Sequence, residues 1–234
     1  MWGFVNCTRY YQSFGAPKVV LHEANLAVRT DERFGLLVRA GEGKSTIVRL
    51  LAGVDRPDEG HVLRDEGGWP LGYPGAFQAQ LTGEENIVNI AEMVGLEPLS
   101  YSAFCADFSE LGEAYFSPLT LYTGRMRAQL AFAASFGMPA TTYLADEKLV
   151  AGDDAFKRKC ASALKSRLDR AGLILVASNP KATKDFCDRH AVLVNGKIIL
   201  CGDHDEAAEL FAASASDPQS DDVGEDELAS FDLA

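Results

Sequence analysis

The chain has 234 residues, of which 34 are Asp or Glu and 22 are Lys or Arg, so its formal net charge is −12. This length provides enough apolar residues for one sizeable α/β domain or two small ones, and the acidic balance excludes nucleic acid as the main partner, because phosphate contacts require a basic face. Five scattered cysteines without a Cys-x-x-Cys pair indicate neither a disulfide framework nor a zinc site. We expect no signal peptide at the N-terminus, and no apolar stretch reaches the roughly 18 residues that span a bilayer.

The apolar pattern predicts strands that alternate with helices along most of the chain. The predicted strands lie at 19–21, 26–28, 34–38, 143–145, 173–176, 191–194 and 198–200. Helices are predicted directly after residue 43, within the mostly helical stretch 84–140 (where one covers 126–136), and at 153–171 and 207–213. Residues 65–83 are too rich in Gly and Pro for a regular element, and Asn195-Gly196 predicts a hairpin turn between the last two strands.

The stretch from Gly35 to Gly53 predicts a phosphate site. An apolar strand leads into a glycine turn and then a helix, and this layout lets backbone N–H groups and a helix N-terminus surround an anion. Lys44 would reach the outer phosphates and the Ser45 hydroxyl would ligate Mg²⁺. The predicted nucleotide-binding residues of this loop are Val38, Arg39, Ala40, Gly41, Glu42, Gly43, Lys44, Ser45 and Thr46.

Val38 departs from the usual phosphate-loop pattern, which has a glycine six residues before the lysine. A β-branched residue prefers an extended backbone. Valine here therefore either prolongs the strand by one residue or narrows the loop and weakens phosphate binding.

The second landmark is the acidic pair Asp146-Glu147, which follows the predicted strand 143–145. An acid at the C-terminal end of such a strand lies at the edge of the sheet where ligands bind. Asp146 would hold the Mg²⁺ of a nucleotide through water, and Glu147 would orient or activate the attacking water. The alternative is that the pair caps the N-terminus of a helix.

The order and spacing of these motifs resemble the ATP-binding subunits of ABC transporters, and most of all those that export capsular and other cell-surface polysaccharides. The resemblance covers about residues 7–212. The matching segments are Gly41–Thr46 (Walker A), 69–86 with Phe77-Gln78 and 81–86 (the Q-loop region), Tyr122–Ala128 (the signature), Tyr143–Glu147 (Walker B), Ala151–Asp153 (the D-loop) and Asn179-Pro180 (the segment after the switch histidine).

The resemblance implies an α/β fold, with a P-loop-type parallel sheet core, antiparallel N-terminal strands and a helical subdomain inserted at about 79–140. A nucleotide-binding domain would cover 1–213, followed by an acidic tail at 214–234 that is expected to be disordered because of its charge and low apolar content. Tyr11, or its neighbour Tyr10, would stack on adenine. Gln78 would contact Mg²⁺ and the membrane subunit, with Gln80 as the alternative.

The resemblance also implies a function. The protein would bind and hydrolyse ATP with Mg²⁺ to power export of a polysaccharide through an integral-membrane permease. It would lie at the cytoplasmic face of the inner membrane, as a peripheral subunit paired with a second copy of itself or with a homologous ATPase.

Three positions depart from the family pattern. Besides Val38, Arg125 stands where the signature has its second glycine, and the switch histidine is replaced by Ser178, or by Asn179 if the alignment is read one residue later. The expected effect is slow hydrolysis with binding retained. The alternative functions are a non-hydrolysing regulatory or structural subunit of such a transporter and, less favoured, a soluble P-loop kinase.

Overall fold

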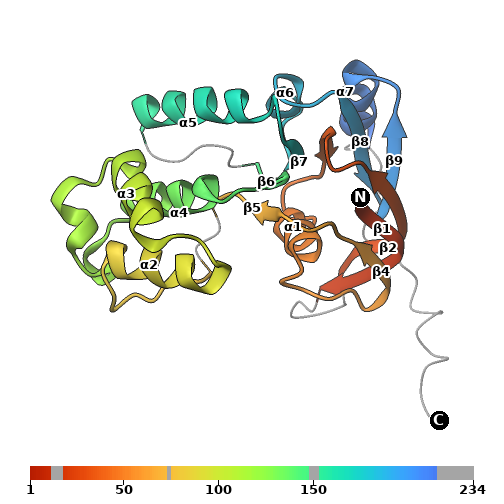
Figure 1. The fold of residues 1–234 in the computed structure, drawn as a ribbon. Coiled ribbons are helices and arrows are strands. Elements are labelled where there is room, and N and C mark those ends of the chain that lie inside the picture. The colour runs from red at the N-terminus through yellow and green to blue at the C-terminus, as the bar shows by residue number, and fades with distance from the viewer. Residues whose placement is uncertain (12–17, 73–74, 148–152, 215–234) are drawn as a thin grey trace, which may run out of the picture.

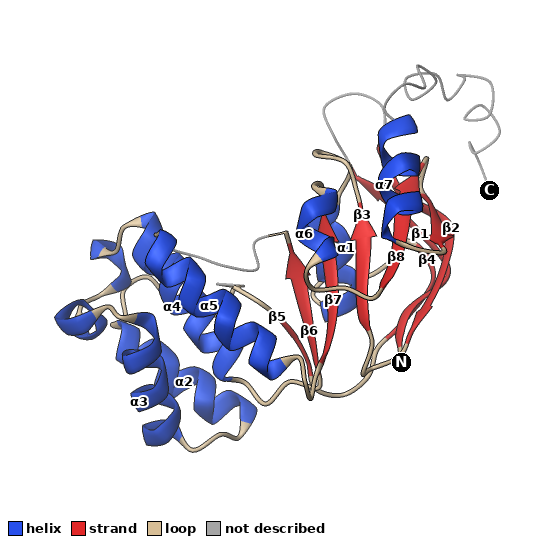
Figure 2. Ribbon diagram, turned by 90° about the horizontal axis from the view of Figure 1, so that it is seen from above, coloured by secondary structure: helices blue, strands red, loops and turns tan. Residues whose placement is uncertain are grey.

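The computed structural model describes residues 1–11, 18–72, 75–147 and 153–214 (Figure 1). These residues form a three-stranded antiparallel sheet, a six-stranded mainly parallel sheet, and a group of helices at the far end of the parallel sheet (Figures 1 and 2). The α/β prediction is therefore confirmed, including its antiparallel N-terminal strands. In the described part of the chain, no helix is long and apolar enough to cross a membrane.

The antiparallel sheet has the order β2-β1-β4, with β1 at Trp2–Tyr11, β2 at Lys18–Val28 and β4 at Glu59–Leu63. The apolar runs predicted as separate strands at 19–21 and 26–28 are both parts of β2. Between them Glu23 has a positive φ of 45°, and its N–H donates to the Thr8 hydroxyl at 3.0 Å. This irregularity shifts the register while the strand continues, which is why the sequence pattern is broken there.

The larger sheet has the order β5-β6-β7-β3-β8-β9. Its strands are β3 (Arg33–Leu37), β5 (Gly68–Pro70), β6 (Thr142–Asp146), β7 (Gly172–Ala177), β8 (Arg189–Val194) and β9 (Lys197–Cys201). All neighbours are parallel except β8 and β9. The expectation that 65–83 contains no regular element is wrong for β5, which pairs with β6.

The strand β3 occupies the middle of the sheet. Phe34 pairs with Ile174 of β7 on one side and with Arg189 of β8 on the other. At the sheet's end, the β8–β9 hairpin turns at Asn195 and Gly196, whose φ angles of 48° and 76° are the left-handed pair that such a two-residue turn requires. The predicted hairpin is confirmed.

Helices cover both faces of the parallel sheet, so the central strands are buried on both sides. Alternate residues of β7 show this. Ile174 and Val176 pack with α1 (Lys44–Ala52) and the antiparallel sheet, whereas Leu173 and Leu175 pack on the other side with α5 (Asp154–Arg167). The remaining helices of this part are α6 (Pro180–Lys184) and α7 (His204–Ala213).

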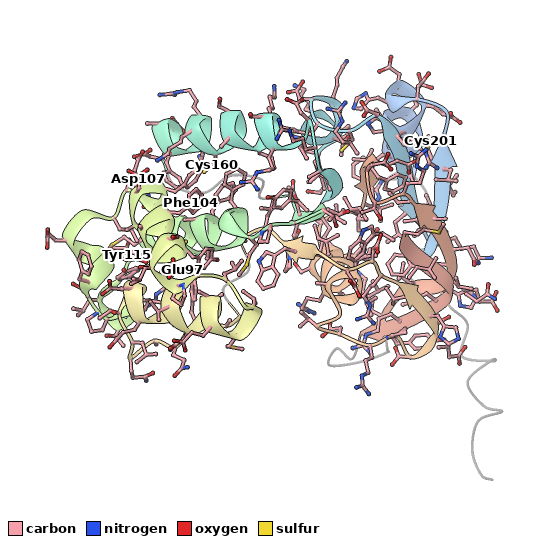
Figure 3. The ribbon with its side chains drawn as sticks, in the orientation of Figure 1. Glu97, Phe104, Asp107, Tyr115, Cys160 and Cys201 are labelled. Atoms are coloured by element: carbon pink, nitrogen blue, oxygen red, sulfur yellow. The ribbon has the colours of Figure 1, made fainter. Side chains whose placement is uncertain are left out.

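A helical lobe lies between β5 and β6 in the sequence. It contains α2 (Gly83–Val94), α3 (Pro98–Ser109), the short 3₁₀ helices η1 (Gly112–Phe116) and η2 (Leu119–Leu121), and α4 (Gly124–Gly137). Phe104, Phe108, Phe132 and Phe136 stack on one another in its interior, and Figure 3 labels Phe104 on α3 and Tyr115 nearby. The predicted limits of this insertion at 79 and 140 and of the domain at 213 remain predictions, and 215–234 lie outside the described residues.

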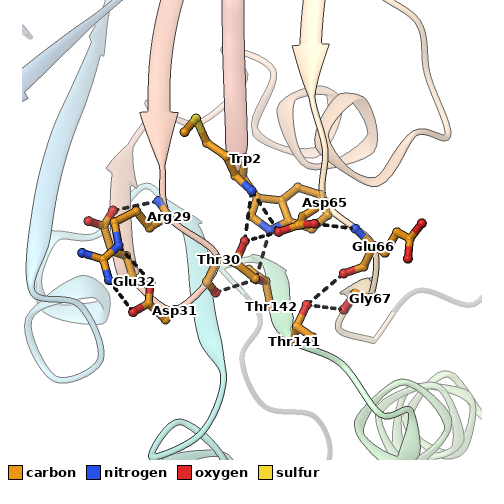
Figure 4. Close-up of polar contacts among 11 residues, drawn as sticks. Trp2, Arg29, Thr30, Asp31, Glu32, Asp65, Glu66, Gly67, Thr141 and Thr142 are labelled. Atoms are coloured by element: carbon orange, nitrogen blue, oxygen red, sulfur yellow. Dashed lines mark hydrogen bonds and ion pairs between the residues drawn. The ribbon is translucent and has the colours of Figure 1, made fainter.

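A network of polar contacts joins the two sheets where β1, β2, β4 and β6 begin or end (Figure 4). The buried Trp2 indole N–H donates to the Thr142 hydroxyl at 3.0 Å, and that hydroxyl donates to the Thr30 carbonyl at 2.7 Å. Gly68 is required beside the indole, since a Cβ there would lie 1.9 Å from a Trp2 ring carbon. This contact fixes the start of β6, and thus the strand that carries Asp146.

Candidate functional site

The loop after β3 begins with Val38, whose role the structure clarifies. Its N–H donates to the Ala177 carbonyl at 2.9 Å, and its side chain is fully buried with the core between α1 and the sheets. Val38 thus extends the contact of β3 with β7 by one residue, as in the first of the two alternatives. Its side chain packs in the core and does not enter the loop.

Two glycines shape the loop. Gly41 and Gly43 have φ angles of 85° and 93°, in the left-handed region that favours glycine, and Gly43 is the N-cap of α1. The Glu42 N–H donates to the Arg39 carbonyl at 3.1 Å and closes the turn. A Cβ on Gly43 would lie 2.5 Å from the Val20 side chain of β2, so the antiparallel sheet packs directly against the loop.

A hollow of about 400 Å³ opens between the loop and β2. It is lined by Lys18, Val20, Gly41, Gly43, Lys44, Ser45, Thr46 and Arg49. Three of these residues are cationic, and the first turn of α1 carries no acidic residue, so its N-terminus keeps its favourable field for an anion. The sequence motifs did not include Lys18, Val20 and Arg49, because their place in the hollow depends on β2 packing beside the loop.

The two predicted motifs meet beside this hollow, through Lys44 and Ser45, which line it. The Ser45 hydroxyl hydrogen-bonds to the Asp146 carboxylate, although the residues are 101 positions apart, and the Lys44 ammonium lies 3.4 Å from a carboxylate oxygen of Glu147. The N-cap of the next helix, α5, is Asp153. The alternative of Asp146-Glu147 as a helix cap is therefore not what this structure shows.

Glu147 is held in one orientation by three contacts. Its backbone has a φ of 45°, and its N–H donates to the Val176 carbonyl at 2.8 Å. The Ser178 hydroxyl lies 2.8 Å from each carboxylate oxygen. Burial disfavours the charged carboxylate, but the Ser178 hydroxyl and the Lys44 ammonium outweigh it, and the pKa of Glu147 lies below its ordinary value.

This geometry distinguishes Ser178 from Asn179, the two residues that could align with the switch histidine. Ser178 reaches Glu147, whereas the Asn179 side chain accepts a hydrogen bond from the Lys181 N–H at 3.0 Å and caps α6. Ser178 therefore occupies the position next to the acid.

The Ser45 hydroxyl and the Asp146 carboxylate are oxygen ligands of the kind that Mg²⁺ prefers, and their direct contact places both at one point. The residues present therefore fit the metal. Gln78 is exposed, and its side chain does not line the hollow. Tyr10 is exposed at the end of β1, and the side chain of Tyr11 lies outside the described residues.

Arg39 takes part in the loop through its backbone only. Its guanidinium donates to the Phe211 carbonyl at 2.9 Å and to the Ser214 hydroxyl at 3.1 Å, which ties the loop to the C-terminal end of α7. Ala40 is exposed beside it.

Arg125 lies in the first turn of α4, where Thr123 is the N-cap. Its guanidinium forms an ion pair with Asp153, the N-cap of α5. The predicted D-loop residues Ala151 and Gly152 lie outside the described part of the chain. Arg125 is thus paired, within its own chain, with the last residue of the predicted D-loop.

A family model described as "ABC transporter" matches residues 21–97. The chain is 37% identical to "ATP-binding protein BexA" of Haemophilus influenzae, over 88% of this chain and 94% of that protein. It is 36% identical to "Capsule polysaccharide export ATP-binding protein CtrD" of Neisseria meningitidis serogroup B, over 83% of this chain and 90% of that protein.

Among solved structures, the fold is similar to the dimeric structure of a post-hydrolysis state of the ATP-binding cassette MJ0796 bound to ADP and Pi. The TM-score is 0.70 with 21% identity, and the similarity covers 85% of this chain and 96% of that one. At this identity the likeness concerns the fold alone. The similarity to the two sequence relatives, in contrast, covers nearly the whole length of those proteins. The chain therefore belongs to the ABC transporter family, among its ATP-binding proteins.

Proposed function

We propose that this chain hydrolyses ATP with Mg²⁺ and that it powers export of a capsular or other cell-surface polysaccharide through a membrane permease. The observation that carries the hydrolysis is that Lys44 and Ser45, which line the hollow, contact the acidic pair: Ser45 hydrogen-bonds to Asp146, and Lys44 pairs with Glu147. The polysaccharide substrate is supported by the names of relatives such as the capsule export protein CtrD and the polysialic acid transport protein KpsT of Escherichia coli.

One set of groups binds the phosphates and another binds the metal. Backbone N–H groups from Gly41 to Thr46 and the Lys44 ammonium hold the phosphates, while Ser45 and Asp146 hold the metal, assisted by Gln78. Mg²⁺, when bound, neutralises charge on the outer phosphates. Tyr11 provides the aromatic face for adenine.

Glu147 acts on the attacking water, as general base or as the group that orients it. Ser178 donates to the carboxylate and so holds it in place. A hydroxyl cannot carry the positive charge of a protonated histidine, so we expect hydrolysis to be slower than with a histidine at this position. The intact set of Lys44, Ser45, Asp146 and Glu147 favours hydrolysis over a purely structural role.

The subunit acts at the cytoplasmic face of the inner membrane, paired with a second copy or with a homologous ATPase, and bound to the permease. The dimer is supported by the dimeric state in the titles of the similar structures. The membrane partner is supported by the relatives named as export ATP-binding proteins.

The test is phosphate release by this protein purified together with its membrane subunit. We expect Glu147→Gln and Lys44→Ala to abolish release, whereas Lys157→Ala, which removes an exposed lysine from α5, leaves it unchanged. In cells, the same two variants should lose surface polysaccharide. Binding of ATP without any release by the unmodified protein would contradict the hydrolysis proposal.

A further inference from the structure

A buried carboxamide on α2 fastens the loop 78–82. Asn86 is only 2% exposed, and its side-chain oxygen accepts from the Gln78 N–H at 2.7 Å. Its amide group donates to the carbonyls of Gln78 at 3.0 Å, Thr82 at 2.8 Å and Leu81 at 3.3 Å. A buried amide with both its donor and its acceptor groups satisfied holds its loop in one conformation.

The other side of this loop is bound to the strip 118–121, which directly precedes the signature segment. The Thr120 N–H donates to the Ala79 carbonyl at 2.9 Å, and the Leu119 N–H donates to the Leu81 carbonyl at 3.0 Å. Thr82 also forms an isolated β-bridge with Pro118. Every one of these links is between backbone atoms, so the loop and the strip cannot shift independently without breaking them.

The strip is in turn attached to α4. The Arg127 guanidinium donates to the Leu119 carbonyl from Nε at 3.3 Å and from Nη2 at 3.2 Å. Two residues beyond the strip, Thr123 caps the helix by accepting from the Met126 N–H at 3.2 Å. The contacts therefore run without a gap from Asn86, through the loop and the strip, to the N-terminal end of α4.

We propose that Asn86 is a positioning residue for the reaction, because it makes Gln78 and the N-terminal end of α4 parts of one rigid piece. The inference rests on the proposed function, with Gln78 as the residue that reaches Mg²⁺. A change in the position of Gln78 is then transmitted to Arg125, and the reverse also holds. Within the described residues, all side-chain hydrogen bonds of Asn86 go to 78–82, so Asn86 has no such contact with the phosphate loop.

Two substitutions and a matched control separate this role from general stability. Asn86→Ala removes the four side-chain hydrogen bonds of Asn86, whereas Asn86→Asp keeps the acceptor for the Gln78 N–H and loses the donors to the carbonyls. The control is Asn89→Ala, which changes the same residue type on the same helix at a half-buried position with no side-chain hydrogen bond among the described residues.

The measurement is amide hydrogen exchange of the subunit in its complex with the membrane partner, combined with a Mg²⁺ titration of ATP turnover. In Asn86→Ala, exchange should accelerate roughly tenfold in both 78–82 and 118–121, the factor expected for the loss of one or two hydrogen bonds. The Mg²⁺ concentration for half-maximal turnover should rise about three- to tenfold, because a misplaced ligand weakens metal binding. ATP binding without Mg²⁺ and the Asn89→Ala control should match the unmodified protein.

Faster exchange confined to 78–82, with an unchanged Mg²⁺ requirement, would show that Asn86 holds only its own loop and would overturn the proposal. If Asn86→Ala does not fold, Asn86→Asp is measured in its place, and the same two outcomes decide. If the unmodified protein releases no phosphate, the proposed function fails separately. The exchange pattern and the Mg²⁺ dependence of ATP binding then decide the role of Asn86.

Discussion

Replacing Ser178 by alanine tests how the acid of this site is held. The substitution removes the hydroxyl that lies 2.8 Å from both oxygens of Glu147 and leaves Lys44 as the remaining charged contact. Nothing else of the loop or of Asp146 is altered, so the variant isolates one interaction.

The size of the effect follows from the contact. A hydrogen bond to a charged group contributes about 1.5–3 kcal/mol, and the Glu147 side chain is 33% exposed, so we take the lower end. Because the Ser178 hydroxyl lowers the pKa of Glu147, its loss raises that pKa towards the ordinary value. The folded-state pKa is depressed, so the contact stabilises the ionised form above it, and this contribution is lost as pH falls through the folded-state pKa.

The assay is the pH profile of ATP turnover. In Ser178→Ala the acid limb should move to higher pH, because the pKa of Glu147 rises when the Ser178 hydroxyl is removed. Near neutral pH, Glu147 is ionised in both proteins, so any loss there reports orientation alone, and we expect about a tenfold decrease. The control is the neighbouring Asn179→Ala, which removes the cap of α6 and should cost about 1 kcal/mol of stability while leaving the acid limb in place.

An acid limb that is identical in Ser178→Ala and in the unmodified protein would refute the reasoning. It would mean that Ser178 does not bear on the ionisation of Glu147. An equal shift in Asn179→Ala would refute it as well, because the effect would then come from α6 as a whole.

Three further substitutions test the packing of the fold and the shape of the phosphate loop. Trp2→Phe removes the hydrogen bond to Thr142, and we expect the free energy of unfolding in urea to fall by about 2 kcal/mol, with ATP affinity unchanged. Tyr115→Phe removes the hydroxyl contact with Ser102 at 2.9 Å inside the helical lobe, which should lower the same quantity by about 1 kcal/mol. Gly43→Ala places a Cβ 2.5 Å from Val20 and forces a positive φ on alanine, so nucleotide binding measured by calorimetry should be lost, and wild-type affinity would contradict the role of this glycine.

The elements that the sequence predicted well are those with a local signal. The phosphate loop, the Asn195-Gly196 turn and the buried strand β7 each depend on residue types that fit one backbone conformation or one environment. The prediction that Ser45 and Asp146 serve one Mg²⁺ requires both residues at the same edge of a parallel sheet, and there their side chains are in contact.

The elements that were missed depend on distant parts of the chain. β5 has three residues, and it is a strand only because β6 pairs with it. α5 ends at Arg167 and not at 171, since Gly172 begins β7 and its Cα faces the Thr30 carbonyl. α3 mixes apolar residues around its circumference, and the one local signal for it was Pro98 at its first position, after the capping Glu97.

The central position of β3 has a consequence for the order in which the protein is built. This strand carries the phosphate loop at its end, but its partners β7 and β8 come more than 130 residues later in the sequence. A chain growing on the ribosome therefore has its loop long before it has the sheet that aligns it, and such non-local pairing is slow. We therefore expect that the nascent chain holds a nucleotide only after residue 194 has been made, when β8 can complete the pairing of β3.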